Sequence, residues 1–392
     1  MINRLRQVFD KLDQFVIKER FSGLDPYDGL NSRLLRATPF YRSQLVRLIW
    51  IQCFKRFSVD LRGPALVPKG FNPKAGALFL SANLRMFQST KEGEFKEESI
   101  KLFSLLKDRM LSRKEGAAWG YNFDWQAKAF FVPQGTPNIV TSVYVGQALL
   151  DYYEILGDVE ARTLALKIKD FILSEMVMWE KPESLCFSYI PEEKAEVHNA
   201  NLLAAAYLSR VYGLTREERL KEMALKAVRF STGDVGEDGY WPYGTMPHHR
   251  WMDNFHTGFN LEALLMVRKY LGIDEWDDLI KRVYRYYIDH FFEKGNIPRY
   301  YSNKTHPIDI HNIAESIILF SKVSADESRL FGEIEKKEAL ERRGLIMDCA
   351  IENFWDKKGY FHYQKGRFLT NKIPYMRWSQ AWMYYAMSWV LS

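Results

Sequence analysis

The feature that most constrains the fold of this chain is a pattern that repeats five times after residue 115. Each copy has an aromatic, strand-like segment, a polar loop, an apolar helix, a short turn and a charged helix. Polar residues mark the starts of the apolar helices at separations of 61, 57, 55 and 66 residues: Asn138, Asn199, His256, His311 and Arg377. This period is longer than that of two-helix solenoid repeats, so it indicates a helical hairpin followed by a long loop.

The two helices of each copy differ in composition. The first is apolar on most faces, as expected of a buried helix, whereas the second is charged and amphipathic. Short turns join the first helix to the second, as at Gly157 and Gly213, whereas the return loops run to roughly 15–25 residues and are expected to carry function. We therefore expect an all-α fold, an (α/α)6 toroid of helical hairpins with short β-segments in the long loops at one end.

The first part of the chain supplies further helices. Residues 1–20, 42–57, 75–87 and 95–112 are expected to be helical, the third of them weakly. The first helix would pair with the last, 375–391, and close the ring. Because no linker or change in composition divides the chain, we expect one domain over residues 1–392.

The N-terminal region is basic. Residues 1–75 contain 14 Lys and Arg against 6 Asp and Glu, a net charge of +8 in a chain whose total is +6. Such a region can dock on an anionic membrane surface or an anionic glycan, although a solvated basic surface is the simpler interpretation.

Several classes of protein are excluded by what the sequence lacks. Three scattered cysteines, Cys53, Cys186 and Cys349, favour a reducing compartment. There is no signal peptide and no apolar run of about 18 residues, so we expect a cytoplasmic protein, with peripheral contact at the inner face of the membrane as the variant that the basic region allows. No P-loop, dinucleotide fingerprint or zinc finger is present, and we expect neither a nucleic-acid partner nor a cofactor.

The candidate site lies where the apolar helices begin. Free backbone N–H groups and the positive ends of helix dipoles converge there, which favours an anionic ligand. We expect acid/base roles for Asp124, because a carboxylate among aromatic rings has a raised pKa, and for His256 and His311, because histidine is a weak helix cap. The expected substrate-binding residues are Trp119, Tyr121, Trp125, Asn199, Trp241, Asp253, Arg377 and Trp378.

Each of these assignments has a structural alternative. The aromatic rings would stack on sugar rings, or they belong to a large aromatic core. Arg377 would hold a substrate carboxylate through two parallel N–H groups, or it forms an ion pair in the core. The Asn and Asp residues are ordinary helix caps if they have no site role.

Two further patterns resemble metal sites. The acidic run 274–278 opens a charged helix, where acidic residues are expected in the first turn. His248 and His249, with Asp253 and His256, lack a further clear ligand. We therefore expect no metal.

One segment points to a known family. Residues 141–150, Thr-Ser-Val-Tyr-Val-Gly-Gln-Ala-Leu-Leu, are similar to a helix of D-glucuronyl C5-epimerase C-terminal domains that carries Gly-Gln followed by apolar residues. Together with the repeats, residues 115–392 resemble the six-hairpin glycosidase-like superfamily, which includes glycoside hydrolases, polysaccharide lyases and these epimerases. The chain also looks like uncharacterised bacterial proteins associated with surface polysaccharide biosynthesis.

The resemblance implies an (α/α)6 toroid and action on a glycan, expected to contain uronate, by epimerisation, hydrolysis or elimination. It assigns no catalytic residue, because none of the superfamily's catalytic residues is matched. Two other functions stay open. One is a non-catalytic glycan-binding or assembly protein, and the other is an isoprenoid-diphosphate enzyme, against which the weak acidic motif counts.

Overall fold

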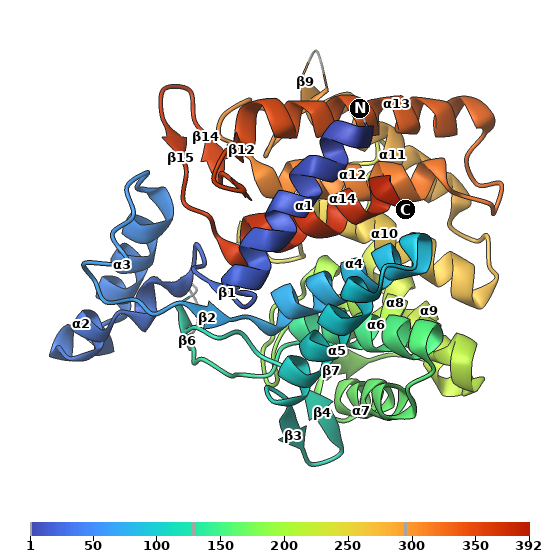
Figure 1. Cartoon of the computed structure of the whole chain (residues 1–392). Coiled ribbons are helices and arrows are strands. Elements are labelled where there is room, and N and C mark those ends of the chain that lie inside the picture. Colours follow the sequence, from blue (N-terminus) through green and yellow to red (C-terminus); the bar gives the residue numbers. More distant parts are fainter. Residues whose placement is uncertain (1, 127–130, 294–295) are drawn as a thin grey trace.

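The computed structural model describes residues 2–126, 131–293 and 296–392, and Figure 1 shows its helices from the side. They form a closed ring of inner helices inside a ring of outer helices. The inner helices are α4 (Pro73–Thr90), α6 (Ile139–Leu156), α8 (His198–Thr215), α10 (Asn254–Leu271), α12 (Ile310–Ser324) and α14 (Trp382–Leu391). The outer helices are α5 (Gly93–Lys107), α7 (Val159–Glu175), α9 (Glu218–Thr232), α11 (Asp277–His290), α13 (Glu333–Phe354) and α1 (Ile2–Lys18). Each inner helix contacts the next, and α14 contacts α4, so the predicted (α/α)6 toroid is confirmed.

The first and last helices close the ring. Helix α1 packs on α14, where the Phe9 and Tyr384 ring centroids lie 4.6 Å apart and Tyr384 Oη donates to Asp13 at 2.7 Å. The N- and C-terminal ends of the chain lie near one another in Figure 1. The sequence prediction that these two helices pair is therefore confirmed.

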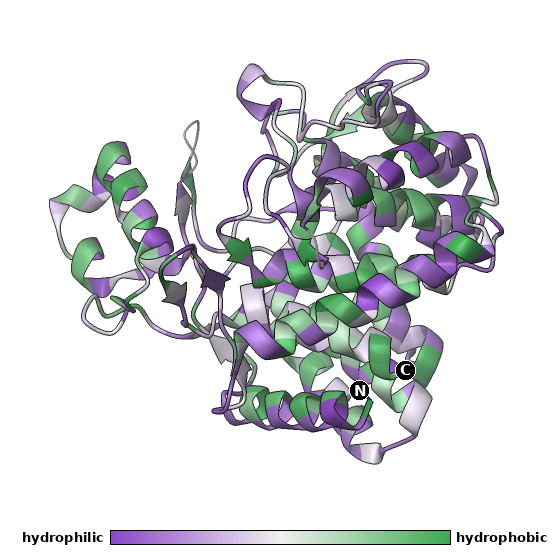
Figure 2. Cartoon of the chain, turned by 90° about the horizontal axis from the view of Figure 1, so that it is seen from above, coloured by the Kyte–Doolittle hydropathy of each residue, from purple (hydrophilic) through white to green (hydrophobic). Residues whose placement is uncertain are grey.

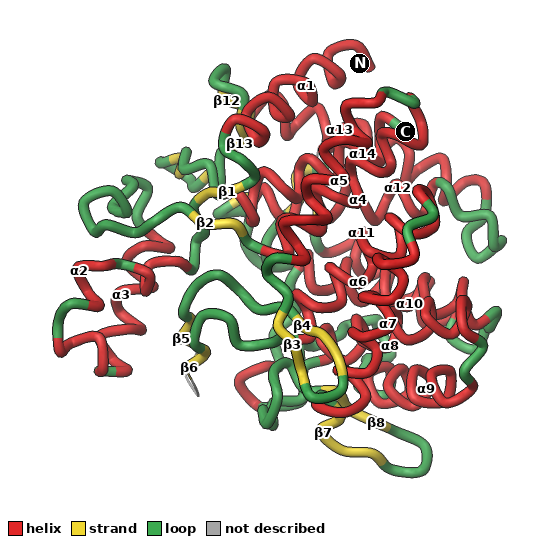
Figure 3. Tube along the Cα trace, turned by 60° about the horizontal axis from the view of Figure 1, so that its bottom comes forward, coloured by secondary structure: helices red, strands yellow, loops and turns green. Residues whose placement is uncertain are grey.

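One end of the ring, where the inner helices begin, carries the long loops, and we call it the elaborated end. All strands of the described residues lie in connections from an outer helix to an inner helix, mostly as short antiparallel hairpins (Figure 3). They are β1 (Ser22–Gly23), β2 (Gly70–Phe71), β3 (Leu111–Arg113), β4 (Gly116–Ala118), β5 (Trp125–Gln126), β6 (Phe131–Val132), β7 (Val177–Glu180), β8 (Leu185–Phe187), β9 (Phe292–Glu293), β10 (Ile297–Pro298), β11 (Ile308–Asp309), β12 (Trp355–Asp356), β13 (Tyr360–Phe361), β14 (Gln364–Lys365) and β15 (Thr370–Asn371).

The opposite, plain end has short turns. Four inner helices end there at a residue in the left-handed conformation, namely Lys91, Gly157, Arg216 and Gly272. The expected turn at Gly213 is wrong, because α8 continues through this residue to Thr215. Gly213 instead allows a close approach of α10, since a Cβ there would lie 3.1 Å from a ring carbon of Tyr270.

Side-chain caps explain why most inner helices begin where they do. The side chains of Asn72, Asn138, Asp253 and Asp309 accept hydrogen bonds from backbone N–H groups in the first turns of α4, α6, α10 and α12. The last inner helix begins differently, with the π-helical turn Met376–Ala381. All five marker residues of the repeat thus lie at the elaborated end, as predicted.

The chain leaves the ring between α1 and α4. The segment 29–69, which we call the arm, contains α2 (Arg33–Arg36) and α3 (Gln44–Arg56) and projects to the side of the ring (Figures 1 and 2). It has small apolar clusters of its own, one around Leu30, Leu35 and Ile51. The helix expected at 75–87 is α4, a full member of the inner ring. No helix of the described residues is long and apolar enough to cross a bilayer.

Candidate active site

Aromatic side chains form a partly exposed wall at the elaborated end. Tyr243, from the loop before α10, stacks on Trp251 with ring centroids 4.4 Å apart and an interplanar angle of 10°. Tyr301, from the loop before α12, meets Trp251 edge-on at 6.4 Å. His256 lies against this wall, 4.7 Å from Tyr243 and 5.7 Å from Trp251. Flat apolar faces beside a titratable ring are the elements of a sugar-binding site.

Asp253 fixes the orientation of His256. Both carboxylate oxygens of Asp253 lie 2.9 Å from His256 Nδ1, and one of them also accepts from the His256 backbone N–H as the cap of α10. The Asp253 side chain is 1% exposed, whereas that of His256 is 20% exposed. A neutral His256 then holds its proton on Nδ1 and presents the lone pair of Nε2, to which no described residue hydrogen-bonds.

His311 lies in the floor below this wall. Its ring centroid is 4.4 Å from that of Trp378 and 4.9 Å from that of Phe255, and neither ring nitrogen has a hydrogen-bond partner among the described residues. Burial, with the nearby charges of Lys74 and Arg377, lowers the pKa of His311 well below its usual value. His311 is therefore a neutral, buried ring that supports the site from beneath and is not exposed beside His256.

Lys74, on the first turn of α4, fills the centre of the ring. Its Nζ lies 4.2 Å from the Tyr144 ring centroid, 5.0 Å from that of Trp382 and 5.3 Å from that of Phe259. Burial, with the charge of Arg377, lowers the pKa of Lys74 well below its usual value. Sequence reasoning missed this residue, although a lysine beside the positive end of a helix dipole is an unfavourable placement that could have signalled it.

Arg377 is already paired. Its Nε and Nη2 donate to the two carboxylate oxygens of Asp25 at 2.7 and 2.8 Å, and both side chains are buried. Burial alone would lower the pKa of Arg377, but the ion pair with Asp25 raises it. The expectation that Arg377 offers two parallel N–H groups to a substrate carboxylate is therefore corrected, and the alternative of a core ion pair holds.

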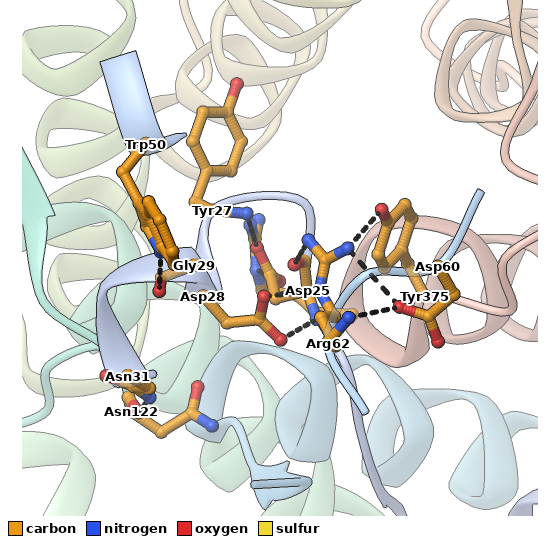
Figure 4. Close-up of polar contacts among 11 residues, drawn as sticks. Asp25, Tyr27, Asp28, Gly29, Asn31, Trp50, Asp60, Arg62, Asn122 and Tyr375 are labelled. Atoms are coloured by element: carbon orange, nitrogen blue, oxygen red, sulfur yellow. Dashed lines mark hydrogen bonds and ion pairs between the residues drawn. The ribbon is translucent and has the colours of Figure 1, made fainter. Parts of the chain in front are cut away.

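The turn that carries Asp25 is held by Arg62 (Figure 4). Arg62 donates to Asp28 at 2.6 Å, to the Asp25 carbonyl at 2.7 Å and to Tyr375 Oη at 2.8 Å. This network joins the N-terminal turn to the residue that precedes the π-helical turn of the last inner helix. Its members are far apart in the sequence, which is why spacing could not reveal it.

The same turn places Tyr27 beside the site. The Tyr27 ring meets Trp378 edge-on with centroids 5.6 Å apart, and Lys55 of the arm donates to Tyr27 Oη at 2.8 Å. Trp50 donates to the Gly29 carbonyl at 2.9 Å and fastens α3 to the end of the turn (Figure 4). The arm therefore borders the elaborated end directly.

Other predicted residues lie at the same end. Tyr121 and Tyr189 share a hydrogen bond of 2.8 Å between their hydroxyls, and Trp125 lies 6.2 Å from Tyr189. All three side chains are partly exposed, so Tyr121 and Trp125 remain candidates for contact with a sugar. Asn199 is buried at the start of α8, and its Nδ2 has no partner among the described residues.

Two predicted stacking residues lie in the core. Trp119 and Trp241 are 0% and 1% exposed, and their Nε1 groups donate to the carbonyls of Leu106 and Ser231. Neither ring offers a face to a ligand, so their assignment to a sugar-binding wall is corrected. They fill the space between inner and outer helices.

Asp124 has a structural role that the sequence did not suggest. One of its oxygens accepts from Arg36 at 2.6 Å and from Tyr41, and the other accepts from the Gln134 backbone N–H at 2.6 Å. The carboxylate therefore anchors the arm to the loop after β6, and the expectation that it is a free acid or base in the site is corrected.

Several side chains of the two metal-like patterns are paired with a cation or turned to solvent, whereas His249 Nδ1 is buried without a hydrogen-bond partner among the described residues. Asp277 of the acidic run pairs with Arg268 at 2.6 Å, and His248 is exposed. Within residues 2–126, 131–293 and 296–392, no three His, Cys, Asp or Glu side chains are grouped to hold a metal ion.

A large cavity lies inside the ring toward the plain end. Its volume is about 1130 Å³, and its deep end is lined by Tyr144, Phe259 and Trp382, the rings that surround Lys74. Five of the charged side chains that line it are paired with one another. Arg210, for example, donates to Asp151 at 2.7 Å and to Glu154 at 2.8 Å.

Two carboxyl groups meet beside this cavity, that of Glu262 in its wall and that of the fully buried Glu315 next to it. Glu262 accepts from Lys322 at 2.7 Å, and burial, with the charge of Glu262, raises the pKa of Glu315 well above its usual value. Gly258 provides the room, because a Cβ there would lie 2.5 Å from Glu315 Oε1. A neutral Glu315 avoids a second negative charge beside the Glu262–Lys322 pair.

No protein-family model matches the chain, and no curated protein sequence matches it. Its fold is similar to that of cellobiose 2-epimerase from Bacillus thermoamylovorans, at 13% identity and a TM-score of 0.63 over 82% of this chain and 87% of that one. A D-mannose isomerase matches at 11% identity and 0.60 over 82% and 86%, and an α-mannanase of Bacteroides thetaiotaomicron at 10% and 0.62 over 81% and 86%. The likeness confirms the fold expected from the six-hairpin glycosidase-like resemblance, an (α/α)6 toroid.

Proposed function

We propose that this protein is a carbohydrate-active enzyme that moves a proton on a sugar, as an epimerase or isomerase does, with His256 as the base. The observation that carries the proposal is the Asp253–His256 pair, whose free Nε2 lies against the partly exposed rings of Tyr243 and Trp251. Two of the similar folds belong to a cellobiose 2-epimerase and a D-mannose isomerase, which supports this class of reaction.

The chemistry follows from the pair. A hydrogen on the carbon next to a sugar carbonyl is acidic enough to be removed by a well-placed imidazole. His256 Nε2 takes this proton, the electron pair moves onto the carbonyl oxygen, and Asp253 stabilises the imidazolium. If the intermediate turns its other face to the imidazolium, return of the proton to the same carbon gives the epimer. Return of the proton to the former carbonyl carbon gives the isomer, because the hydroxyl proton of the neighbouring carbon then moves to the former carbonyl oxygen and leaves a new carbonyl behind.

Hydrolysis is the weaker candidate at this end. Glycosidases use two carboxyl groups on either side of the bond that breaks. The carboxylates near His256 are engaged, since Asp253 binds His256, Asp25 binds Arg377, and Asp309 accepts from Gln364 and Trp378. Support for a hydrolase therefore comes from likeness of fold alone, such as that to the α-mannanase.

The proposal does not require a uronate. Arg377, the residue that was expected to select a carboxylate, is occupied by Asp25. We therefore propose that a sugar binds by stacking on Trp251 and Tyr243 and by hydrogen bonds through its hydroxyls. A role in surface polysaccharide metabolism rests on the sequence resemblance alone.

Hydrogen exchange tests the proposal. A panel of reducing mono- and disaccharides, with uronates included, is incubated with the protein in deuterated water, and nuclear magnetic resonance follows deuterium at the carbon next to the carbonyl. We expect incorporation with at least one sugar and a loss of about 10²–10⁴ in rate for His256→Asn. His248→Asn, in an exposed histidine of the same loop, is the matched control and should leave the rate unchanged.

Two outcomes would overturn the proposal. Incorporation that survives in His256→Asn would remove His256 from the reaction. A sugar that binds tightly without any exchange, hydrolysis or elimination would instead favour the glycan-binding alternative.

A further inference from the structure

Exposed apolar side chains gather on the arm. Leu34, Phe40, Leu45 and Ile49 are 50%, 64%, 66% and 55% exposed, and Figure 2 shows apolar colouring on both projecting helices. Leu45 and Ile49 are one turn apart on α3 and share its outer face, while Ile51 and Phe54 are buried on the inner side. Scattered exposed leucines are ordinary, but four large apolar side chains on one projection mark a surface for interaction.

The same projection is strongly basic. Residues 29–59 contain six Lys or Arg and no Asp or Glu. Arg33, Arg42 and Arg56 are exposed, and none of them pairs with a carboxylate of the described residues. The positive charge of the arm is therefore free to act on a partner.

A second projection repeats this combination. The tip of the β14–β15 hairpin carries Phe368 and Leu369, which are 87% and 70% exposed, next to Arg367. No acidic residue follows Asp356 in the chain. The hairpin and the arm both project on the same side of the ring in Figure 1, and Asn371 donates to the Phe57 carbonyl at 3.1 Å.

We propose that the arm and the β14–β15 tip together dock on the surface of an anionic lipid bilayer. The arginines would meet the lipid headgroups, and the phenylalanine and leucine side chains would enter the boundary between headgroups and acyl chains. A second copy of the chain fits this surface poorly, because two arms pressed together would bring like charges into contact. An acidic protein would satisfy the arginines, and the experiment below separates it from a bilayer.

Docking in this way would bring the candidate site to the membrane. Lys55 of the arm contacts Tyr27, whose ring meets Trp378 of the floor. A sugar carried by a membrane lipid would then reach the wall beside His256 without leaving the surface. This consequence rests on the proposed function, whereas the docking itself does not.

Co-sedimentation with vesicles tests the docking without any sugar. The full chain is mixed with vesicles of phosphatidylcholine alone or of an equal mixture of phosphatidylcholine and phosphatidylglycerol. We expect sedimentation with the mixed vesicles only, falling as salt rises because the attraction between exposed charges is screened. Equal sedimentation with both kinds of vesicle, or with neither, would overturn the proposal and would leave the proposed reaction untouched.

Variants locate the contact. Phe40→Ser with Leu45→Ser should lower the vesicle partition coefficient about tenfold or more, since two large apolar side chains no longer enter the lipid. Arg33→Gln and Arg42→Gln should each lower it about fivefold. All four positions are exposed, and unchanged thermal unfolding would show that the fold is kept.

Matched controls use other surfaces. Ile334→Ser changes an isoleucine that is 85% exposed on α13, and Arg219→Gln with Arg282→Gln removes two exposed arginines from the outer helices α9 and α11. These variants should bind like the parent. If they lose as much binding as the arm variants, or if the arm variants bind like the parent, the arm is not the docking surface. If the arm variants bind vesicles like the parent, an acidic protein becomes the favoured partner of the arm.

Discussion

The two ends of the ring differ in what their polar groups are free to do. At the plain end a cavity of about 1130 Å³ is lined with charged side chains, yet Arg210 is bound by Asp151 and Glu154, and Lys322 by Glu262. At the elaborated end His256 keeps one ring nitrogen without a partner among the described residues, beside partly exposed aromatic faces.

On the proposed function, a large hollow need not be the reactive place of the ring. Charges that neutralise one another stabilise a wall, whereas a titratable group held by one neighbour and open on its other side can exchange protons with a ligand. The lengths of the connecting loops explain why the two ends differ. Short left-handed turns leave no room for added residues, while the long loops bring Tyr243, Trp251 and Tyr301 over the helix starts.

Among the variants that test the difference between the two ends, Asp253→Asn is expected to have the largest effect on activity. Asparagine caps α10 as well as aspartate does, but it no longer holds the proton of His256 on Nδ1, so kcat on the sugar found by exchange should fall about 10²–10³-fold with little change in KM. Arg85→Gln, which alters a cavity-lining arginine stacked on Trp389 at the plain end, should change kcat less than about twofold. Equal losses in the two variants would erase the distinction between the ends.

A stability measurement should test whether the paired charges at the plain end stabilise the fold. Lys322→Met leaves Glu262 without its cation and next to Glu315, and leaving a partly buried carboxylate unpaired in this way costs about 1–3 kcal/mol of unfolding free energy. Urea denaturation of parent and variant measures the loss. A change below about 1 kcal/mol would mean that these charges are not a structural unit.

The pH dependence of stability should distinguish Asp309, at the elaborated end, from the ion-paired residues of the cavity. Burial raises the pKa of Asp309 from 3.8 to about 6, despite hydrogen bonds from Gln364 and Trp378. A carboxyl whose pKa is raised by folding contributes stability that is complete below its unfolded pKa and is lost as the pH rises through its folded pKa.

The free energy of unfolding of the parent should therefore fall relative to that of Asp309→Asn, by roughly 3 kcal/mol from pH ~4 to pH ~7, since each pKa unit corresponds to about 1.4 kcal/mol. Denaturant titrations of both proteins across this range provide the measurement. A difference that stays constant with pH would show that Asp309 is ionised at all these values.

The smallest effects should come from the two ends of α6. Asn138→Ala removes the cap at the elaborated end, and Gly157→Ala forces a Cβ onto a residue with φ of 76° at the plain end. Each should cost about 1 kcal/mol of unfolding free energy. Asn138→Asp keeps the capping oxygen and should be nearly neutral; a loss equal to that of Asn138→Ala would show that the cap is not what Asn138 contributes.

The ring, and the end of it that carries the long loops, could be predicted from the sequence because both depend on a pattern that repeats along the chain. The apolar pattern identifies each inner helix, and the spacing of Asn138, Asn199, His256, His311 and Arg377 places their starts together. Ion pairs between residues far apart in the sequence leave no such repeating pattern. The partner of Arg377 is Asp25, 352 positions earlier in the chain, so no periodicity could reveal that the arginine is occupied.

Aromatic composition gave wrong predictions of sugar-stacking residues for a related reason. The sequence does not tell which rings of a loop point outward and which point between the helices. Trp241 enters the core whereas Tyr243, two positions later, stays partly exposed because its ring stacks on Trp251. Likewise, Asp124 looked like a free acid until the fold placed Arg36 and Tyr41 of the arm against it.

The most direct test of the account is a crystal structure of His256→Asn with a sugar that undergoes exchange in the parent protein. We predict a sugar ring stacked on Trp251 or Tyr243, with its exchanging carbon roughly 3–3.5 Å from the position that His256 Nε2 would occupy. A sugar bound in the cavity at the plain end, beside Arg85 and Trp389, with the wall at the elaborated end empty, would contradict the central claim.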